Sequence, residues 1–271
     1  MTNLPQLIDA TLEITGRIAV LTFQRDDVRN ALTGTSLVDD LVATVTWADR
    51  CDGISVLVIT GAGTAFSAGG NVKEMKDREG IFAGSPLSIQ DQYRRGIQRI
   101  PMALHQAEIP VIAAVNGPAI GAGFDLACMC DIRVGSAKTL FGETFINLGI
   151  IPGAGGAWFL QRLIGYQKAA ELTLTGRLIK AEEALQLGLL LKLCEPEMLL
   201  QQTMALAEEI AANPPLTVRL TKRLLKIAQR EELRDFLDLS ACFQGMVHHT
   251  DDHSEAINAF LDKKKPVYRG T

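Results

Sequence analysis

Two glycine-rich turns are the features of this sequence whose residue types and positions could do chemistry. The apolar run at 54–60 (ISVLVIT) leads into GAGTAFSAGGN, and the run at 109–116 (IPVIAAVN) leads into GPAIGAG. Backbone N–H groups at a turn that opens a helix have no partner inside the helix. Two such groups that converge form an oxyanion hole, which stabilises negative charge developing on a carbonyl oxygen. A single glycine turn is more often only a tight connection, but a third turn, IPGAGGAW at 151–158, follows another strand end, and three such turns favour a ligand site at the carboxyl ends of the strands.

Carbonyl chemistry of this kind also needs a carboxylate that can move a proton. Asp125 lies three residues after Ala122 in the second turn, and Glu143 is the next acidic side chain in a strand-end segment. Asp125 could also act as a helix-start carboxylate that interacts with free N–H groups. Glu143 could cap a turn or form an ion pair at the surface. Both alternatives stay open, and the two roles of Asp125 are compatible.

Other site motifs do not fit. Phe66 and Leu126 stand where the third glycine of a G-x-G-x-x-G dinucleotide fingerprint belongs, and no Walker or G-x-S-x-G motif is present. The HHTDDH run at 248–253 resembles a metal cluster, but a polar stretch between helices is better explained as a solvated turn. Cys128 and Cys130 have no second Cys or His pair nearby, so we interpret them as core residues.

The composition is that of a globular protein. Of 271 residues, 47% are apolar, which is enough for a core, and the net charge of −4 argues against a generally basic nucleic-acid binder. Five cysteines make an odd, sparse set that favours reduced thiols over a disulfide scaffold. The first residues show no basic segment followed by an apolar run, and no apolar stretch is long enough to span a membrane. We therefore expect a cytoplasmic protein without nucleic-acid or membrane partners.

The pattern of elements predicts an α/β protein. A hairpin or a tight strand turn is expected around Gly16, buried strands at 54–60 and 109–116, a short strand at 131–135, and a helix at about 90–106. Strands that alternate with helices favour parallel pairing. The interpretation divides the chain into an α/β core at 1–195 and a helical region at 196–271.

The helical region carries a modest basic face. Its cations Lys222, Arg223, Lys226 and Arg230 are interspersed with leucines, and we interpret them as a solvated helix face rather than an RNA-binding surface.

Five ordered segments resemble one known family. They are RDDVRNAL (25–32), GTAFSAGGNVKEM (63–75), the run at 113–134, FGETFINLGIIPGAGGAW (141–158) and LTGRLIKAEEALQLGLL (174–190). Together they look like the enoyl-CoA hydratase/isomerase, or crotonase, superfamily. The resemblance implies a crotonase-type spiral of ββα units with a helical C-terminal trimerisation region, and a coenzyme A thioester as ligand.

The resemblance also implies roles for particular residues. The oxyanion donors would be the N–H groups of Gly70 and Ala122, where Ala122 replaces a more usual glycine but keeps its N–H. Arg29 and Ala31 fall where the family holds the adenine and pantetheine parts of coenzyme A, and Phe260 and Lys263 match a segment that reaches the coenzyme from a neighbouring subunit. The remaining residues implied to contact coenzyme A or substrate are Ala68, Gly69, Asn71, Lys73, Gly121 and Phe145.

The departures from the family pattern concern the acids. The first glutamate of the family's hydratases maps to Asp125, which is one methylene shorter, and the second maps to Phe145, which transfers no proton. Members with an acid further along place it near Gly153, where glycine cannot serve. Some naphthoate-synthase-type members use the position of Glu143 instead. In an extended segment, residues two apart share a face, so we predict that Glu143 enters the pocket beside Phe145 and forms the acid/base pair with Asp125.

The expected activity is hydration of a 2-enoyl-CoA to a 3-hydroxyacyl-CoA through an enolate held in the oxyanion hole. The alternatives are isomerisation or other enolate chemistry on an unusual acyl-CoA, and a non-catalytic acyl-CoA binder. We expect no metal and no cofactor, since coenzyme A is part of the substrate, and a homotrimer or a dimer of trimers.

Overall fold

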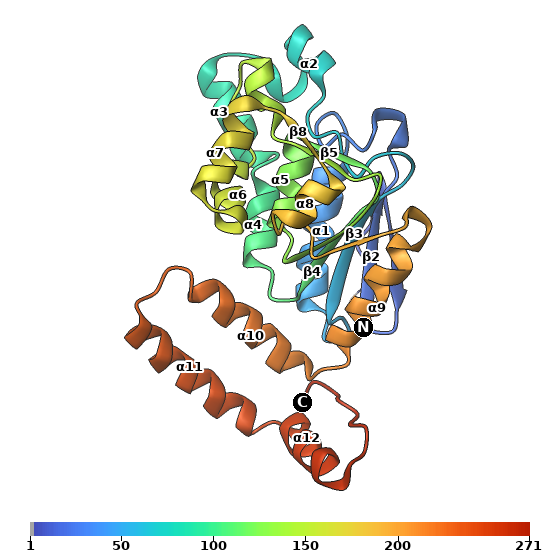
Figure 1. The fold of residues 1–271 in the computed structure, drawn as a ribbon, viewed down its shortest axis with the longest axis vertical. Helices are drawn as coiled ribbons and strands as arrows, with labels where there is room; N and C mark the ends of the chain where they lie inside the picture. Colours follow the sequence, from blue (N-terminus) through green and yellow to red (C-terminus); the bar gives the residue numbers. More distant parts are fainter. Residues whose placement is uncertain (1–2) are drawn as a thin grey trace.

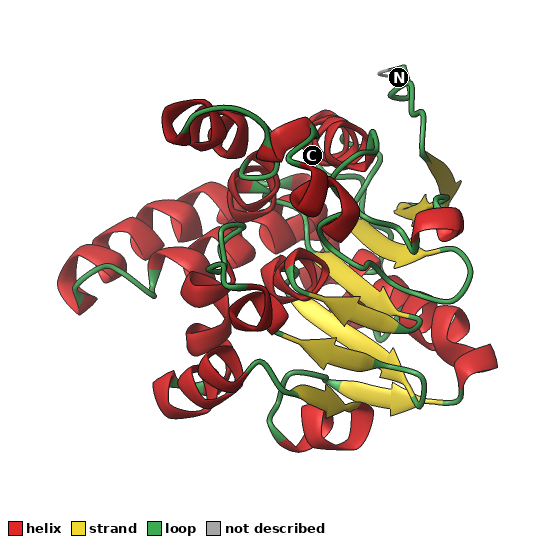
Figure 2. Ribbon diagram, turned by 90° about the horizontal axis from the view of Figure 1, so that it is seen from above, coloured by secondary structure: helices red, strands yellow, loops and turns green. Residues whose placement is uncertain are grey.

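The computed structural model describes residues 3–271. Two β-sheets lie at the centre with helices on either side, and the last helices extend from one end of this body (Figures 1 and 2). The larger sheet has the strand order β1 (Ala10–Thr15), β2 (Ile18–Phe23), β3 (Val56–Gly61), β4 (Val111–Val115), β6 (Ile132–Ser136), β9 (Lys192–Cys194). The smaller sheet has the order β5 (Pro118–Ile120), β7 (Leu140–Gly142), β8 (Leu178–Lys180).

The strand pairing confirms the predicted α/β pattern. β1 and β2 form the antiparallel hairpin around Gly16, whose φ of +58° suits glycine, and the other neighbours in the large sheet pair in parallel. Every residue of β3 and β4 is buried, which explains why these strands read as continuous apolar runs. In the small sheet β5 pairs in parallel with β7, and β7 pairs antiparallel with β8.

The first helices of the chain surround this core. The helix expected at about 90–106 is two helices, because the chain breaks at Gly96, where a Cβ would lie 2.6 Å from the carbonyl oxygen of Gln92. The helices up to β9 are α1 (Leu37–Arg50), α2 (Val72–Asp77), α3 (Pro86–Arg95), α4 (Arg99–Gln106), α5 (Ala122–Met129), α6 (Gly156–Ile164), α7 (Tyr166–Thr175) and α8 (Ala181–Gln186).

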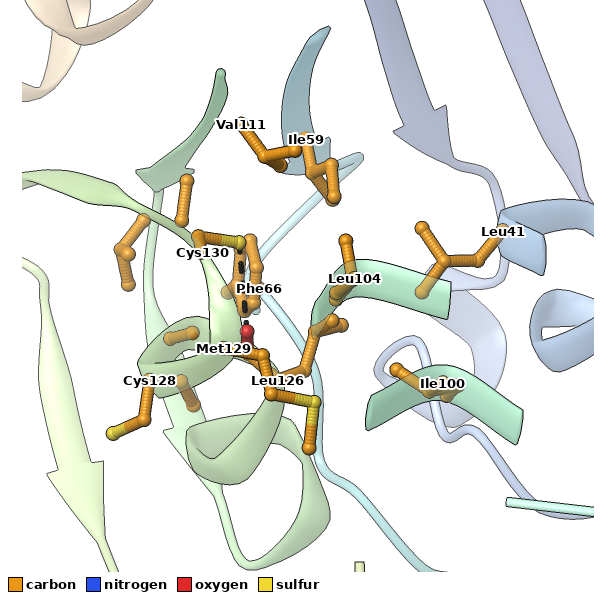
Figure 3. Close-up of a cluster of buried hydrophobic side chains, with 14 of the residues drawn as sticks. Leu41, Ile59, Phe66, Ile100, Leu104, Val111, Leu126, Cys128, Met129 and Cys130 are labelled. Carbon is orange, nitrogen blue, oxygen red and sulfur yellow. Dashed lines mark hydrogen bonds between the residues drawn. The ribbon is translucent and has the colours of Figure 1, made fainter. Parts of the chain in front are cut away.

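Helix α5 is the central helix of the main core. All eight of its residues are buried, so it has no polar face. Figure 3 shows it among apolar side chains from α1, β3, α4 and β4, with the thiol of Cys130 donating to the carbonyl oxygen of Leu126 at 3.5 Å. Cys128 and Cys130 are core residues, as predicted, and the cysteines among the described residues are free thiols. The amino end of α5 is therefore fixed by a fully packed body.

The C-terminal helices divide into one that packs on the sheet and three that extend from it. α9 (Leu199–Ala211) covers the face of the large sheet opposite the main core, against β2, β3, β4 and β6. In Figure 1, α10 (Pro215–Ile227) lies below the body, α11 (Leu233–His248) lies beyond α10, and α12 (Asp251–Asp262) lies at the end of the molecule. No helix within residues 3–271 has the length and apolar character needed to cross a bilayer.

The interpretation of the basic residues on α10 as a solvated face is wrong for two of them. The buried ammonium of Lys222 pairs with Asp131 at 2.6 Å, and Lys226 donates to three backbone carbonyls at the end of α4. These cations anchor α10 to the body because their charges are used inside the chain. They are therefore not available to a nucleic acid.

Arg133 on β6 holds the carboxyl end of α5. Its guanidinium is buried and donates to the carbonyl oxygens of Leu189 at 2.6 Å, Cys130 at 2.7 Å and Ala127 at 3.4 Å. A cation at this end of a helix also interacts favourably with the helix dipole. Arg133 thus links α5 to the loop before β9.

Replacing Arg133 with methionine should lower the free energy of unfolding by about 2–3 kcal/mol, because buried carbonyl groups lose their donor. Urea unfolding followed by circular dichroism measures this. The matched control is Arg95→Met, whose side chain is 82% exposed in an ion pair with Asp91 and should matter by less than about 1 kcal/mol. Equal stability of the two variants would contradict the role given to Arg133.

Candidate active site

Two backbone segments, 67–70 and 120–123, lie in direct contact. The N–H of Ile120 donates to the carbonyl oxygen of Ser67 at 3.0 Å, and Ser67 forms a parallel bridge with Ala119. A Cβ on Gly69, whose φ is +76°, would lie 2.8 Å from the nitrogen of Ala122, and one on Gly123 would lie 2.1 Å from the oxygen of Ser67. Only glycine permits this approach, which brings the two predicted turns together.

The N–H groups of Gly70 and Ala122 belong to these adjoining segments. Within the described part of the chain, neither donates a hydrogen bond, whereas their neighbours Gly69 and Asn71 donate to the hydroxyls of Ser67 and Thr33. Ala122 is the first residue of α5, so its N–H is one of the unpaired groups at the amino end of that helix. The chain thus presents two unpaired amides from neighbouring segments, and their role as oxyanion donors stays a prediction.

The carboxyl groups of Asp125 and Glu143 meet in the interior. Asp125 is fully buried in the first turn of α5, and Glu143 is 1% exposed at the end of β7. A Cβ built on Gly156 would lie 2.0 Å from Oδ1 of Asp125 and 2.3 Å from Oε1 of Glu143, so both oxygens occupy the space that a side chain would fill. Gly156 opens α6, and its missing side chain lets the two carboxyls adjoin each other.

Burial controls the ionisation of this pair. It raises the pKa of Asp125 to about 7, an effect that the hydrogen-bonding groups of Glu143 and the Gly156 N–H partly oppose. Burial and the adjoining Asp125 charge raise the pKa of Glu143 to about 10. Within residues 3–271, no group donates to any of the four carboxyl oxygens with normal hydrogen-bond geometry. Both shifts favour the neutral acids, so the adjoining carboxyls keep a proton between them at neutral pH.

The route by which Glu143 enters the interior differs from the prediction. We expected an extended segment, but Glu143 (φ −89°, ψ 61°) directly precedes a 3-10 helix over Thr144–Leu148, so the argument that 143 and 145 share an extended face is wrong. The turn instead directs Glu143 to Asp125 and lays the ring of Phe145 on Gly121, at 3.5 Å from a Cβ built there.

The residues assigned to coenzyme A in the first half of the chain lie beside the two turns. Ala31 forms a parallel bridge with Gly69, and the N–H of Ala68 donates to the carbonyl of Arg29 at 2.8 Å. The exposed side chain of Arg29 projects from a left-handed residue with φ of +52°. The fold brings these residues to the edge of the candidate oxyanion hole.

Asn71 and Lys73 follow directly on this edge. The side-chain oxygen of Asn71 accepts from the N–H of Lys73 at 3.1 Å and caps α2, while Lys73 itself is exposed. The described contacts of Asn71 are therefore structural.

Phe260 and Lys263 are not brought to this site within one chain. They lie on and directly after α12, at the end of the molecule opposite α2 (Figure 1), and Phe260 is 81% exposed. Their predicted contact with coenzyme A requires a neighbouring subunit and stays a prediction.

Sequence reasoning missed Gly156 and Tyr93. The glycine run GAGGAW predicted a turn. The structure adds the reason for glycine at 156, because the carboxyls of Asp125 and Glu143 occupy the space that a side chain would need. Tyr93 on α3 packs on Gly153, where a Cβ would lie 2.7 Å from its ring. No motif pointed to Tyr93, because its stretch of sequence has little pattern.

Comparisons with known proteins agree with this geometry. Residues 13–271 match the family model described as enoyl-CoA hydratase/isomerase. The chain belongs to the enoyl-CoA hydratase/isomerase family. It is 34% identical over 263 residues to a short-chain-enoyl-CoA hydratase of Clostridium acetobutylicum, covering 96% of this chain and 97% of the relative. It is also 34% identical over 254 residues to a 2,3-dehydroadipyl-CoA hydratase of Escherichia coli, covering 94% and 96%.

Solved structures of the family share the whole fold. An enoyl-CoA hydratase from Bacillus anthracis has a TM-score of 0.90 at 32% identity, covering 97% of this chain and 100% of that one. A putative enoyl-CoA hydratase from Streptomyces coelicolor has a TM-score of 0.91 at 30% identity, covering 100% and 98%. The predicted crotonase-type fold with a helical C-terminal region is confirmed.

The buried pair predicts how stability of this family member depends on pH. A pKa raised by folding means that the native state binds more protons than the unfolded chain, so stability falls as pH rises through the folded pKa. For Asp125 the loss extends to about pH 7, and for Glu143 to about pH 10. Between pH 5 and 9, the wild-type free energy of unfolding should fall more than that of Glu143→Gln. The difference should be at least about 1.4 kcal/mol, which corresponds to a shift of one pKa unit.

Urea unfolding at pH 5, 7 and 9 measures that difference. The control is Glu208→Gln on the exposed side of α9, which should keep the wild-type slope. Parallel slopes for Glu143→Gln and wild type would contradict the shared proton.

Proposed function

We propose that this protein hydrates 2-enoyl-CoA thioesters to 3-hydroxyacyl-CoA, and so acts as a lyase. One observation carries the proposal: two unpaired main-chain amides adjoin, through the first turn of α5, a buried pair of carboxyls. The two relatives are named as a short-chain-enoyl-CoA hydratase and a 2,3-dehydroadipyl-CoA hydratase, and this chain matches nearly the full length of both. Their names support the same reaction.

In the proposed mechanism, the thioester oxygen accepts hydrogen bonds from Gly70 and Ala122. These amides polarise the carbonyl and the conjugated C2=C3 bond, and they stabilise the enolate that forms. Ionised Asp125 takes a proton from water as the water oxygen bonds to C3. Glu143 gives its proton to C2, and the carbonyl reforms.

The adjacency of the two carboxyls completes this cycle. After addition, Asp125 carries the proton from water and Glu143 is ionised, so a proton must pass from Asp125 to Glu143 before the next turnover. Both oxygens adjoin Gly156, which places donor and acceptor side by side for that transfer. The mechanism needs no metal or redox cofactor, since the two amides polarise the thioester carbonyl and no electrons are transferred to or from the protein.

Isomerisation is the second candidate, and one feature favours it. Phe145 occupies the position of the family's second hydratase glutamate, and its ring packs on Gly121. A carboxyl pair on one side of the acyl chain could remove a proton from C2 of a 3-enoyl-CoA and return it to C4, which gives the conjugated 2-enoyl-CoA. Loss of conjugated-thioester absorbance in water indicates hydration, whereas a gain from a 3-enoyl-CoA indicates isomerisation. Absence of both in a protein that binds acyl-CoA would indicate a non-catalytic binder.

We also propose a homotrimer, or a dimer of trimers, built on the C-terminal helices. Apolar side chains on α11 and α12 are exposed in one chain, including Leu233, Leu237 and Phe260. Association would cover them and bring Phe260 and Lys263 of one subunit to the coenzyme of another.

The oxyanion hole is tested by Ala122→Pro. Proline removes the N–H, and the first position of a helix tolerates proline because that N–H has no helical partner. Turnover of crotonyl-CoA should fall by about 100- to 1,000-fold while the far-ultraviolet spectrum is kept. Ala122→Gly retains the N–H and should lose less than about tenfold. A folded Ala122→Pro protein with wild-type turnover would overturn the proposed role.

The pH profile tests the assignment of base and acid. The value of kcat/KM should rise through about pH 7 as Asp125 ionises and fall toward about pH 10 as Glu143 loses its proton. Asp125→Asn should remove the low-pH limb and lower turnover by about 100- to 10,000-fold. A flat profile from pH 6 to 9 in the wild-type enzyme would contradict this assignment.

A further inference from the structure

A cavity of about 660 Å³ lies between α3 and the loop that leads to α6. One wall is polar and consists of Gln90, Tyr93, Arg94 and Gln98, from α3 and the start of α4. The other wall consists of Gly149, Ile150, Ile151 and Gly153. None of these residues belongs to the oxyanion segments or the carboxyl pair.

The cavity adjoins the reacting end of the site through one short turn. Gly156 at the end of this turn touches the carboxyls of Asp125 and Glu143, and Gly153 at its start touches the ring of Tyr93. The amide of Gln98 donates to the carbonyl of Gly153 at 2.9 Å and fixes the turn. With the thioester oxygen at Gly70 and Ala122 and C3 at the carboxyls, an acyl chain that continues along 156 to 153 arrives at Tyr93.

Tyr93 is positioned to contact that chain. Its ring lies 2.7 Å from a Cβ built on Gly153, and it packs edge-on against Phe82 at 6.4 Å between centroids. These two contacts hold the ring, while its hydroxyl makes no hydrogen bond within the described chain. Burial raises the pKa of Tyr93, so the hydroxyl stays a neutral donor at working pH.

Two further side chains of the polar wall have no ion pair or hydrogen bond among the described residues. The guanidinium of Arg94 forms no ion pair within residues 3–271, although its neighbour Arg95 pairs with Asp91. The side-chain amide of Gln90 also has no hydrogen bond among the described residues. Gln90 and Arg94 are exposed and donate to solvent, whereas a purely hydrocarbon chain would separate the half-buried Tyr93 hydroxyl from water without giving it a new partner. An oxygen atom on the chain would supply that partner.

We propose that Tyr93 is a specificity-determining residue, which selects enoyl-CoA substrates whose acyl chain carries an oxygen-bearing group at its far end. The chain's apolar middle lies against Ile150 and Ile151, and the terminal oxygen accepts a hydrogen bond from the Tyr93 hydroxyl. Gly153 is required because any side chain would displace the ring. This inference rests on the proposed hydratase function and names its substrate class.

The experiment compares two substrates of equal length, trans-2-hexenoyl-CoA and its 6-hydroxy analogue. Wild-type kcat/KM should favour the hydroxylated substrate by about tenfold, since a hydrogen-bonding site discriminates against an analogue that lacks the partner. Tyr93→Phe keeps the ring and removes the donor, so the ratio should fall to about one. The control Tyr166→Phe, at an exposed position on α7, should keep the wild-type ratio.

Equal wild-type activity on both substrates, or a preference that persists in Tyr93→Phe, would overturn the proposal. Titration calorimetry with hexanoyl-CoA and 6-hydroxyhexanoyl-CoA gives the same comparison without turnover. If wild type turns over neither enoyl-CoA nor crotonyl-CoA, the hydratase proposal fails. The binding preference and its loss in Tyr93→Phe then still decide the role of Tyr93.

Discussion

Direct backbone contact between 67–70 and 120–123 is the constraint on which the rest of the structure depends. The contact exists because residues 69 and 123 lack side chains, and the hydrogen bond from Ile120 to Ser67 holds it. It aligns a loop after β3 with the amino end of α5, two elements about fifty residues apart in the sequence. The buried body of α5, and Arg133 at its other end, keep that alignment rigid. Preorganised amides act strongly only when such surroundings prevent them from reorienting.

Burying the carboxyls of Asp125 and Glu143 lowers the stability of the fold, and this points to a function for the pair. Two acids without normal hydrogen-bond donors lower the stability of the fold, and they persist because one of them stays neutral. Buried acids with shifted pKa values, which lower the stability of the fold, are common in sites that transfer protons. Burial raises the pKa of both acids, and the adjoining charge of Asp125 raises that of Glu143 further.

Much of this arrangement could be predicted from the sequence, and for identifiable reasons. Continuous apolar runs predicted the positions of β3 and β4, and the glycine turns after them predicted where unpaired N–H groups lie. The pairing of Asp125 with Glu143 was expected, but through the wrong local geometry, because a 3-10 turn after β7 leaves no periodic signal. Gly156 and Tyr93 escaped prediction since their importance lies in contacts with residues far away in the chain. The inward cations of α10 escaped for the same reason: a helical pattern shows where residues lie on a helix, not what packs on it.

The absence of a side chain at Gly156 limits how this position can vary. Both carboxyl oxygens occupy the volume that a methyl group would need, so even the smallest side chain would push Asp125 and Glu143 apart or displace the start of α6. A substitution there would act on the site without replacing any of the groups assigned to it.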